Sequence, residues 1–181
     1  MLDAKNSTLY QEAVRRKRTD LPEIRLCASV LTLAGAIAAD CARRLAQHHL
    51  SEGKFVMLIV LHESKIGLPP NELATRCGVT RATVTGLIDG LERDGLARRV
   101  ADQKDRRSLQ VQLTEKGQDL ARIVFDEHAE WLSTVFCRLD RHQSDLLASL
   151  VQTLWQNTDT GRQAARTSES EQNQIISGIV S

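Results

Sequence analysis

The residues best suited to contact a partner lie in two neighbouring stretches of the sequence. The first contains Thr80, Arg81, Ala82 and Thr85, which share one face if this stretch is helical. Short side chains let such a helix enter a major groove, where threonine methyls can contact thymine methyls and an arginine can reach a guanine edge or a phosphate. An ordinary solvated helix has a similar face, so this stretch alone leaves both interpretations open.

The second stretch is a polar connection, residues 102–107, between two segments typical of strands, 96–101 and 108–113. Residues 93–107 carry six cations and three anions, a local charge of +3 on a chain of formal charge +1. The cations are Arg93, Arg98, Arg99, Lys104, Arg106 and Arg107, and the anions are Asp94, Asp102 and Asp105. A basic hairpin directly after a recognition helix is typical of a wing, whose arginines are attracted by the minor groove. This position favours DNA as the partner.

The elements that hold these residues follow from a set of small, glycine and apolar positions. Leu73 and Cys77 form the inner face of a short helix, and Ala74 is small where a second helix must cross closely. Gly78 is expected to end the first helix with a positive φ, and Thr80 to cap the second. On that second helix the inward residues are Val84, Leu87, Ile88 and Leu91. Two helices that cross steeply about a tight turn form a helix-turn-helix.

Long helices are predicted on both sides of this motif. Apolar residues recur at steps of three and four over 21–46 and occupy so wide an arc that two sides of the helix need cover. Ser51 is the predicted N-cap of a helix at 52–64, and its apolar run Phe55–Leu61 could instead be a buried strand. We favour the helix because the neighbouring segments are helical. Two more helical patterns follow residue 113.

Composition excludes several classes of protein. The chain has 181 residues, of which 41% are hydrophobic and 3% aromatic, which favours helices packed by aliphatic side chains. The first 21 residues are too polar for a signal peptide, and the run Phe55–Leu61 is too short to span a bilayer, so we expect a cytoplasmic protein. Motifs for phosphate binding, acyl transfer or metal ligation are missing, so we expect no enzyme, no cofactor and no metal site.

The motifs, taken in order, resemble the multiple-antibiotic-resistance regulator (MarR) family. The resemblance spans about residues 21–157 and is most specific at 68–117. It is carried by four segments: Leu50-Ser-Glu-Gly-Lys-Phe55, Leu73-Ala to Gly78-Val-Thr-Arg-Ala-Thr-Val-Thr85, Leu91-Glu-Arg-Asp-Gly-Leu96, and Asp105-Arg-Arg107 to Leu113-Thr-Glu-Lys-Gly117. Two residues depart from the family pattern. Pro69 stands where Ser or Thr often caps the first helix, and Gly86 stands where a larger residue is common.

The resemblance implies a mainly α-helical protein with a small β-hairpin wing, a winged helix-turn-helix with N- and C-terminal dimerisation helices. As a homodimer it would bind double-stranded DNA at a pseudo-palindromic operator. Thr80, Arg81, Ala82 and Thr85 would read the major groove. The wing residues Lys104, Asp105, Arg106 and Arg107 would serve the minor groove, with Arg107 inserted and Asp105 holding the wing.

The resemblance also implies a repressor that a small aromatic, phenolic or antibiotic-like effector releases from DNA. Arg25, Met57 and Trp131 are the candidate pocket residues, although packing and solvated charge are the favoured explanation for all three. Two alternatives stay open: a cysteine-oxidation sensor of the same fold, and a winged-helix module for protein contacts without DNA. Cys27, Cys41 and Cys77 are expected to be structural, because they lie on inward faces, and Cys137 is the expected exposed thiol.

Five segments are therefore expected along the chain. A basic flexible arm or frayed helix start covers 1–19, and N-terminal dimerisation and central helices cover 20–64. The DNA-binding lobe covers 65–117, the C-terminal dimerisation helices 118–158 and a disordered tail 159–181.

Overall fold

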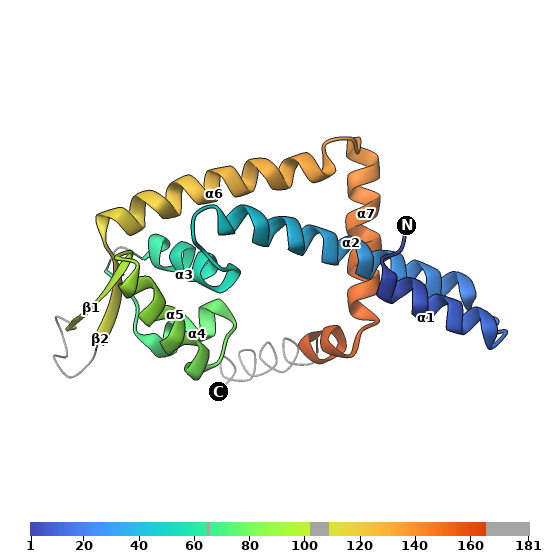
Figure 1. The fold of residues 1–181 in the computed structure, drawn as a ribbon, viewed down its shortest axis with the longest axis horizontal. Helices are drawn as coiled ribbons and strands as arrows, with labels where there is room; N and C mark the ends of the chain where they lie inside the picture. Colours follow the sequence, from blue (N-terminus) through green and yellow to red (C-terminus); the bar gives the residue numbers. More distant parts are fainter. Residues whose placement is uncertain (65, 102–108, 166–181) are drawn as a thin grey trace, which may run out of the picture. The chain divides into compact units, whose positions relative to one another are not determined.

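The computed structural model describes residues 1–64, 66–101 and 109–165, and the chain divides into two compact units, Met1–Ala129 and Glu130–Ser181. Among these residues the structure is helical apart from one two-stranded sheet (Figure 1). The predicted class, mainly α with a small β-hairpin, is therefore confirmed.

The first unit begins with two helices, α1 (Ala4–Arg15) and α2 (Leu21–Ala46). Residues 4–15, where we expect a flexible arm or the frayed start of a helix, form a helix that two polar contacts fix. Asp3 caps α1 by accepting from the Asn6 backbone N–H at 2.7 Å, and the Asn6 amide donates to Thr32 Oγ1 of α2 at 3.1 Å. The second contact joins positions 26 residues apart, which the local pattern of a polar segment does not predict.

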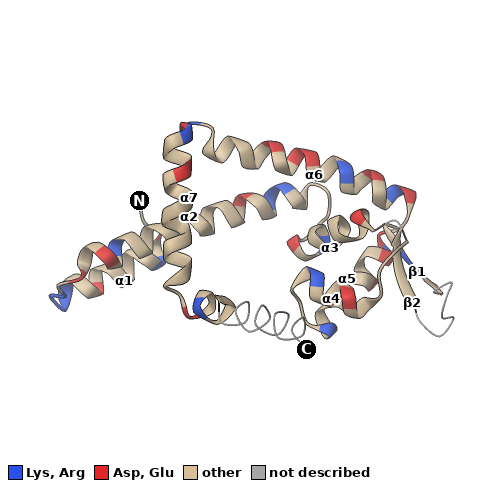
Figure 2. Cartoon of the chain, turned by 180° about the vertical axis from the view of Figure 1, so that it is seen from behind, with Lys and Arg blue, Asp and Glu red and all other residues tan. Residues whose placement is uncertain are grey.

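Helix α2 has the predicted bounds, but much of its apolar surface is exposed in the single chain. Residues 26–39 carry no charged side chain, and Figure 2 shows α2 free of charge along most of its length. Only its C-terminal part enters the core, through Cys41 and Leu45. By length and composition alone, α2 is also the one helix among the described residues that could cross a membrane.

The lobe that follows contains α3 (Glu52–Glu63), α4 (Pro70–Cys77) and α5 (Arg81–Arg93). Ser51 caps α3 as predicted, and the run Phe55–Leu61 is helical and supplies buried core residues. The core closes around aliphatic side chains, with Met57, Leu58, Leu73 and Leu91 fully buried. Pro69 stands at the N-cap of α4 and offers no side-chain hydrogen bond, so α4 begins without a polar cap.

The strands β1 (Ala97–Ala101) and β2 (Leu109–Leu113) pair antiparallel, with Ala97 opposite Leu113 and Ala101 opposite Leu109. Leu68 adds an isolated bridge to Val111, through backbone hydrogen bonds of 3.0 and 2.9 Å. Because Val111 and Leu113 are buried, the sheet is anchored to the lobe at the end near α5.

Helix α6 (Glu115–Phe136) leaves the sheet at a close crossing. A Cβ on Gly117 would collide with the Leu96 carbonyl oxygen, so only glycine fits there. In the second unit, an Asp140–Gln143 capping box starts α7 (Arg141–Gln156). Residues 159–165 are helical, although the sequence favoured disorder from 159; the rest of that tail lies outside the described residues.

Candidate nucleic-acid interface

The turn between α4 and α5 has the geometry that the sequence predicts. Gly78 adopts φ 65° and ψ 31°, and the Val79 N–H donates to the Ala74 carbonyl at 3.0 Å. A Cβ at Gly78 would meet open space, so the requirement for glycine comes from the left-handed backbone alone. Ala74 is buried at the crossing. These features fix the angle at which α5 leaves α4.

Helix α5 has one face in the core and the other in solvent. Val84, Ile88 and Leu91 are at most 1% exposed, whereas Arg81, Ala82 and Thr85 are exposed. The Thr80 hydroxyl accepts from the Thr83 N–H at 3.2 Å, which confirms the predicted cap. Among the described residues the Arg81 guanidinium has no ion pair. The outward face is therefore open to a partner.

This face continues onto the start of α4, which sequence reasoning missed. Pro70 and Asn71 line a surface concavity of about 510 Å³ together with Arg81, Val84 and Thr85. Asn71 lies in the first turn of α4, where backbone N–H groups lack helical partners and attract anions. The Pro-Pro pair that starts this helix was the available signal, because proline is common in a first helical turn.

The cations of the hairpin do not all serve one purpose. Arg99 of β1 donates to Asp89 Oδ1 at 2.6 Å and also to the Glu92 carboxylate, both on α5. The Arg99 N–H donates to Glu92 Oε1 at 2.9 Å, so a single carboxylate holds the strand and the guanidinium. Arg99 therefore positions the sheet against α5, and part of the local +3 charge is neutralised by two acids just before residue 93. Lys104, Asp105, Arg106 and Arg107 lie outside the described residues.

A second ion pair lies at the C-terminal cap of α5. Lys54 of α3 donates to Asp94 Oδ2 at 2.6 Å, and this hydrogen bond lowers the pKa of the Asp94 carboxyl. Lys116 of α6 donates to the Asp94 carbonyl at 2.9 Å. Helices α3 and α6 thus both contact the C-terminal end of α5.

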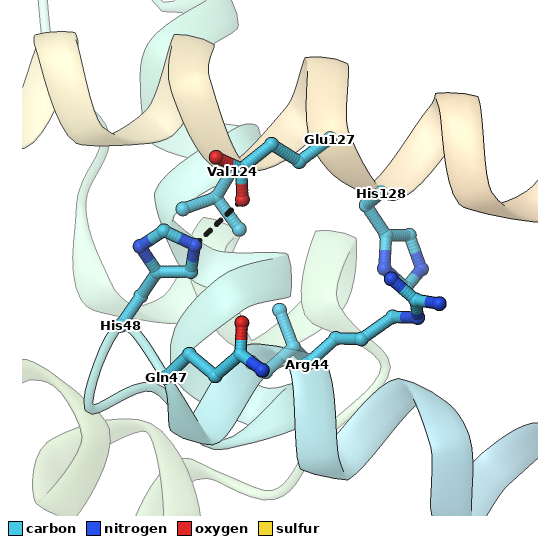
Figure 3. A pocket seen from close by; sticks show the side chains of 7 residues that line it. Arg44, Gln47, His48, Val124, Glu127 and His128 are labelled. Carbon is cyan, nitrogen blue, oxygen red and sulfur yellow. Dashed lines mark hydrogen bonds and ion pairs between the residues drawn. The ribbon is translucent and has the colours of Figure 1, made fainter.

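Arg25 and Met57, two of the three predicted pocket residues, do not share a pocket. Met57 is fully buried in the core of the lobe. Arg25 is exposed on α2 beside a concavity of about 440 Å³, which is also lined by Tyr10, Leu21, Pro22, Leu26 and Ser29. Trp131 belongs to the second unit. A smaller pocket of about 30 Å³ lies between α2 and α6 and is lined by Arg44, Leu45, Gln47, His48, Val124, Glu127 and His128 (Figure 3).

The cysteines differ from expectation at one position. Cys41 and Cys77 are partly buried, and burial raises the pKa of both thiols, which disfavours the reactive thiolate. Cys27 was expected to be covered but is exposed, because it lies on the part of α2 that the single chain leaves open. Cys137 is exposed as expected. Among the described residues no group of side chains could hold a metal ion.

Comparison with known proteins shows which family this part of the chain resembles. The sequence profile of the MarR family matches residues 54–108. The chain is 36% identical over 108 residues to the transcriptional repressor YetL of Bacillus subtilis, a match that covers 59% of this chain and 65% of the repressor. It is 27% identical over 146 residues to the transcriptional repressor MprA of Escherichia coli, covering 79% and 83% of the two chains.

Solved structures agree on the fold. FabT of Streptococcus pneumoniae, crystallised in complex with DNA, superimposes with a TM-score of 0.64 at 20% identity, over 73% of this chain and 94% of FabT. Both sequence relatives are named as repressors and neither as an enzyme. The winged helix-turn-helix predicted from the sequence is therefore confirmed.

Proposed function

We propose that this chain is a MarR-type winged helix-turn-helix transcription regulator, a homodimeric repressor that binds a pseudo-palindromic operator; the match of residues 54–108 to the MarR family and the repressor relatives support this. The observation that carries the proposal is the division of α5 into a buried face and an exposed face, where Arg81 has no ion pair with any residue that the structure describes. Arg81, Ala82 and Thr85 enter the major groove, with the Thr80 hydroxyl retained as the helix cap. The wing residues Lys104 to Arg107 contact the backbone and minor groove, with Arg107 inserted and Asp105 holding the wing.

The exposed face of α2 supports the dimer. Leu26, Val30 and Leu33 lie at helical spacing with 45–58% of their surfaces exposed, more than an isolated chain in water normally leaves open. Since Cys41 and Leu45 of the same helix pack into the lobe core, the cover we propose is a second copy of the chain and not a bilayer. The cytoplasm, where the DNA lies, is the corresponding location.

For the effector we propose a small aromatic or phenolic acid at the concavity beside Arg25. Its volume of about 440 Å³ lies within the range of small-ligand sites. Leu21, Pro22 and Leu26 supply apolar walls, and the exposed Arg25 guanidinium supplies a charge for a carboxylate or phenolate. Met57 and Trp131 have no part in this version of the site. Cysteine oxidation is the weaker alternative, because Cys41 and Cys77 have raised pKa values.

DNA binding is tested with a duplex that the wild-type protein selects from a random-sequence pool. Arg81→Ala is expected to weaken binding by about 1–3 kcal/mol if it reads a base, or to reduce the salt slope by about one unit if it contacts a phosphate. Arg107→Ala tests the wing in the same way. Arg122→Ala is the matched control, since this exposed arginine lies on α6, outside the proposed interface.

Fluorescence anisotropy over a salt series measures both quantities. If the wild-type protein binds no duplex, the result would favour the alternative function, a winged-helix module for protein contacts without DNA. Arg81→Ala protein that binds as tightly as wild type would remove α5 from the interface. A thermal-shift screen with small aromatic acids tests the effector, and stabilisation that survives in Arg25→Ala would place the ligand elsewhere.

A further inference from the structure

Two adjacent residues of α6 contact α2, the turn after it, and α3, the first helix of the lobe. Glu127 Oε2 lies 2.7 Å from Nε2 of His48, in the turn after α2. His128 Nε2 lies 3.9 Å from Cys41 Sγ of α2, and its ring packs 5.0 Å from Phe55 of α3, centroid to centroid. We call these five residues the histidine joint. It joins α2, α3 and α6 at one place.

The turn between α2 and α3 transmits any movement at this joint, because its backbone is fixed. The Leu50 N–H donates to the Leu45 carbonyl at 3.1 Å, and both leucines are at most 5% exposed. Residue 51 then caps α3 directly. A shift of α6 against α2 would therefore move the start of the lobe.

The two histidines sit in opposite electrostatic surroundings. His48 faces a carboxylate, so a proton on its ring converts a hydrogen bond into an ion pair. His128 is partly buried and faces Arg44 across the small pocket, where a proton on its ring would add a second cation (Figure 3). Burial first, and Arg44 second, lower the pKa of His128, and the nearby Glu52 of α3 opposes them. The uncharged thiol of Cys41 offers no compensation.

We infer that the histidine joint positions the DNA-binding lobe, and that protonation of His128 opens the joint and weakens DNA binding. This inference rests on the proposed function, since it needs a DNA-binding lobe to position. The sign follows from linkage. An opened joint exposes His128 to water, so the open form takes up protons near the ordinary value of 6.5, before the closed form does. The closed form is therefore favoured above this pH and loses population as the pH falls below it.

The test compares DNA affinity between about pH 8 and about pH 5.5, with the duplex selected at the higher pH. Wild-type affinity is expected to fall, by at most about tenfold for each chain, since pH 5.5 lies one unit below the ordinary value of 6.5. His128→Gln keeps a polar group beside Cys41 but cannot take a proton, and it should keep most of its affinity over the same range. His62→Gln, which removes an exposed histidine from α3, should follow the wild-type profile.

A second variant tests the contact that closes the joint. Glu127→Gln removes the carboxylate that contacts His48, so its DNA affinity should be lower than that of wild type even at about pH 8. A flat wild-type profile, or a His128→Gln profile that falls like wild type, would overturn the inference. Thermal unfolding over the same pH series gives a readout without DNA: the midpoint of wild type should fall below that of His128→Gln as the pH decreases. Equal midpoints would contradict the joint, whereas a failure to bind DNA at any pH would contradict the proposed function alone.

Discussion

The lobe buries its apolar side chains, whereas helix α2 leaves many of its own exposed. In the lobe, Leu73, Val84 and Leu91 are at most 1% exposed, and α4 and α5 close over a core that their own chain completes. In α2, Leu26 and Leu31 are more than half exposed. The lobe therefore completes its own core, whereas α2 exposes an apolar surface that we propose a second chain covers. Substitutions of the same residue type should consequently affect different measurements in the two regions.

The largest effect on stability is expected in the lobe core. Leu73→Ala leaves a cavity at a fully buried position and should lower the free energy of unfolding by about 2–5 kcal/mol. Leu31→Ala, on the exposed part of α2, should cost much less at a protein concentration low enough to keep the chain monomeric. Urea denaturation measures the free energy of unfolding of both variants. Equal losses would contradict the difference between the two regions.

Self-association should be weakened by substitutions on α2 and not by substitutions in the lobe. Leu26 and Leu33 lie seven residues apart on one face of α2, so Leu26→Glu with Leu33→Glu would place charges in the proposed dimer contact. We expect dimerisation at least about tenfold weaker, corresponding to about 1.4 kcal/mol. Ile66→Glu, an exposed apolar residue of the lobe, is the control. Sedimentation equilibrium measures the dimerisation constant. If the double variant dimerises as strongly as wild type, the dimer contact lies on another surface.

A smaller effect is expected at the turn of the helix-turn-helix. Gly78→Ala forces a Cβ into a left-handed backbone and should destabilise the lobe by about 1 kcal/mol. Gly86→Ala, in open space within α5, should instead stabilise it by about 0.5–1 kcal/mol. If both substitutions destabilise the lobe equally in thermal unfolding, backbone conformation is not what selects glycine at residue 78.

The smallest effect is expected for the partly exposed pair of Lys54 and Asp94. Solvent screening limits the pair to less than about 1 kcal/mol. Because the pKa of Asp94 is lowered, its stabilisation is present above the ordinary value of 3.8 and disappears as the pH falls through the lower, folded value. Asp94→Asn should therefore be less stable than wild type at neutral pH and should equal it in strong acid. A constant difference at all pH values would contradict this origin.

The sequence predicted what local rules determine. Gly78, Thr80 and the inward residues of α5 were identified because cap chemistry and helical spacing act over a few positions. The major-groove and wing residues also came from the sequence, and their roles stay predictions. Contacts between distant segments were not accessible: the Asn6 hydrogen bond that orders α1 and the pairing of Arg99 with Asp89 and Glu92 appear only in the folded chain.

The predicted pocket failed for the same reason: it depended on contacts between segments that are distant in the sequence. Met57 and Arg25 were chosen because their helices were expected to meet, yet the pattern of a helix does not tell which residue the core encloses. The fold buries Met57 and leaves Arg25 open, and it brings His48 and Glu127 together from positions 79 residues apart. None of these three outcomes has a short-range signal.

A footprint on the selected duplex tests the central claim most directly, because it requires both the open face of α5 and the uncovered face of α2. Two lobes of one dimer must reach successive major grooves on the same side of DNA. Wild-type protein should protect two symmetric half-sites about one helical turn apart, and the double variant of Leu26 and Leu33 should lose this paired protection at the same concentration. Protection of a single half-site by the wild type, or none, would contradict the account.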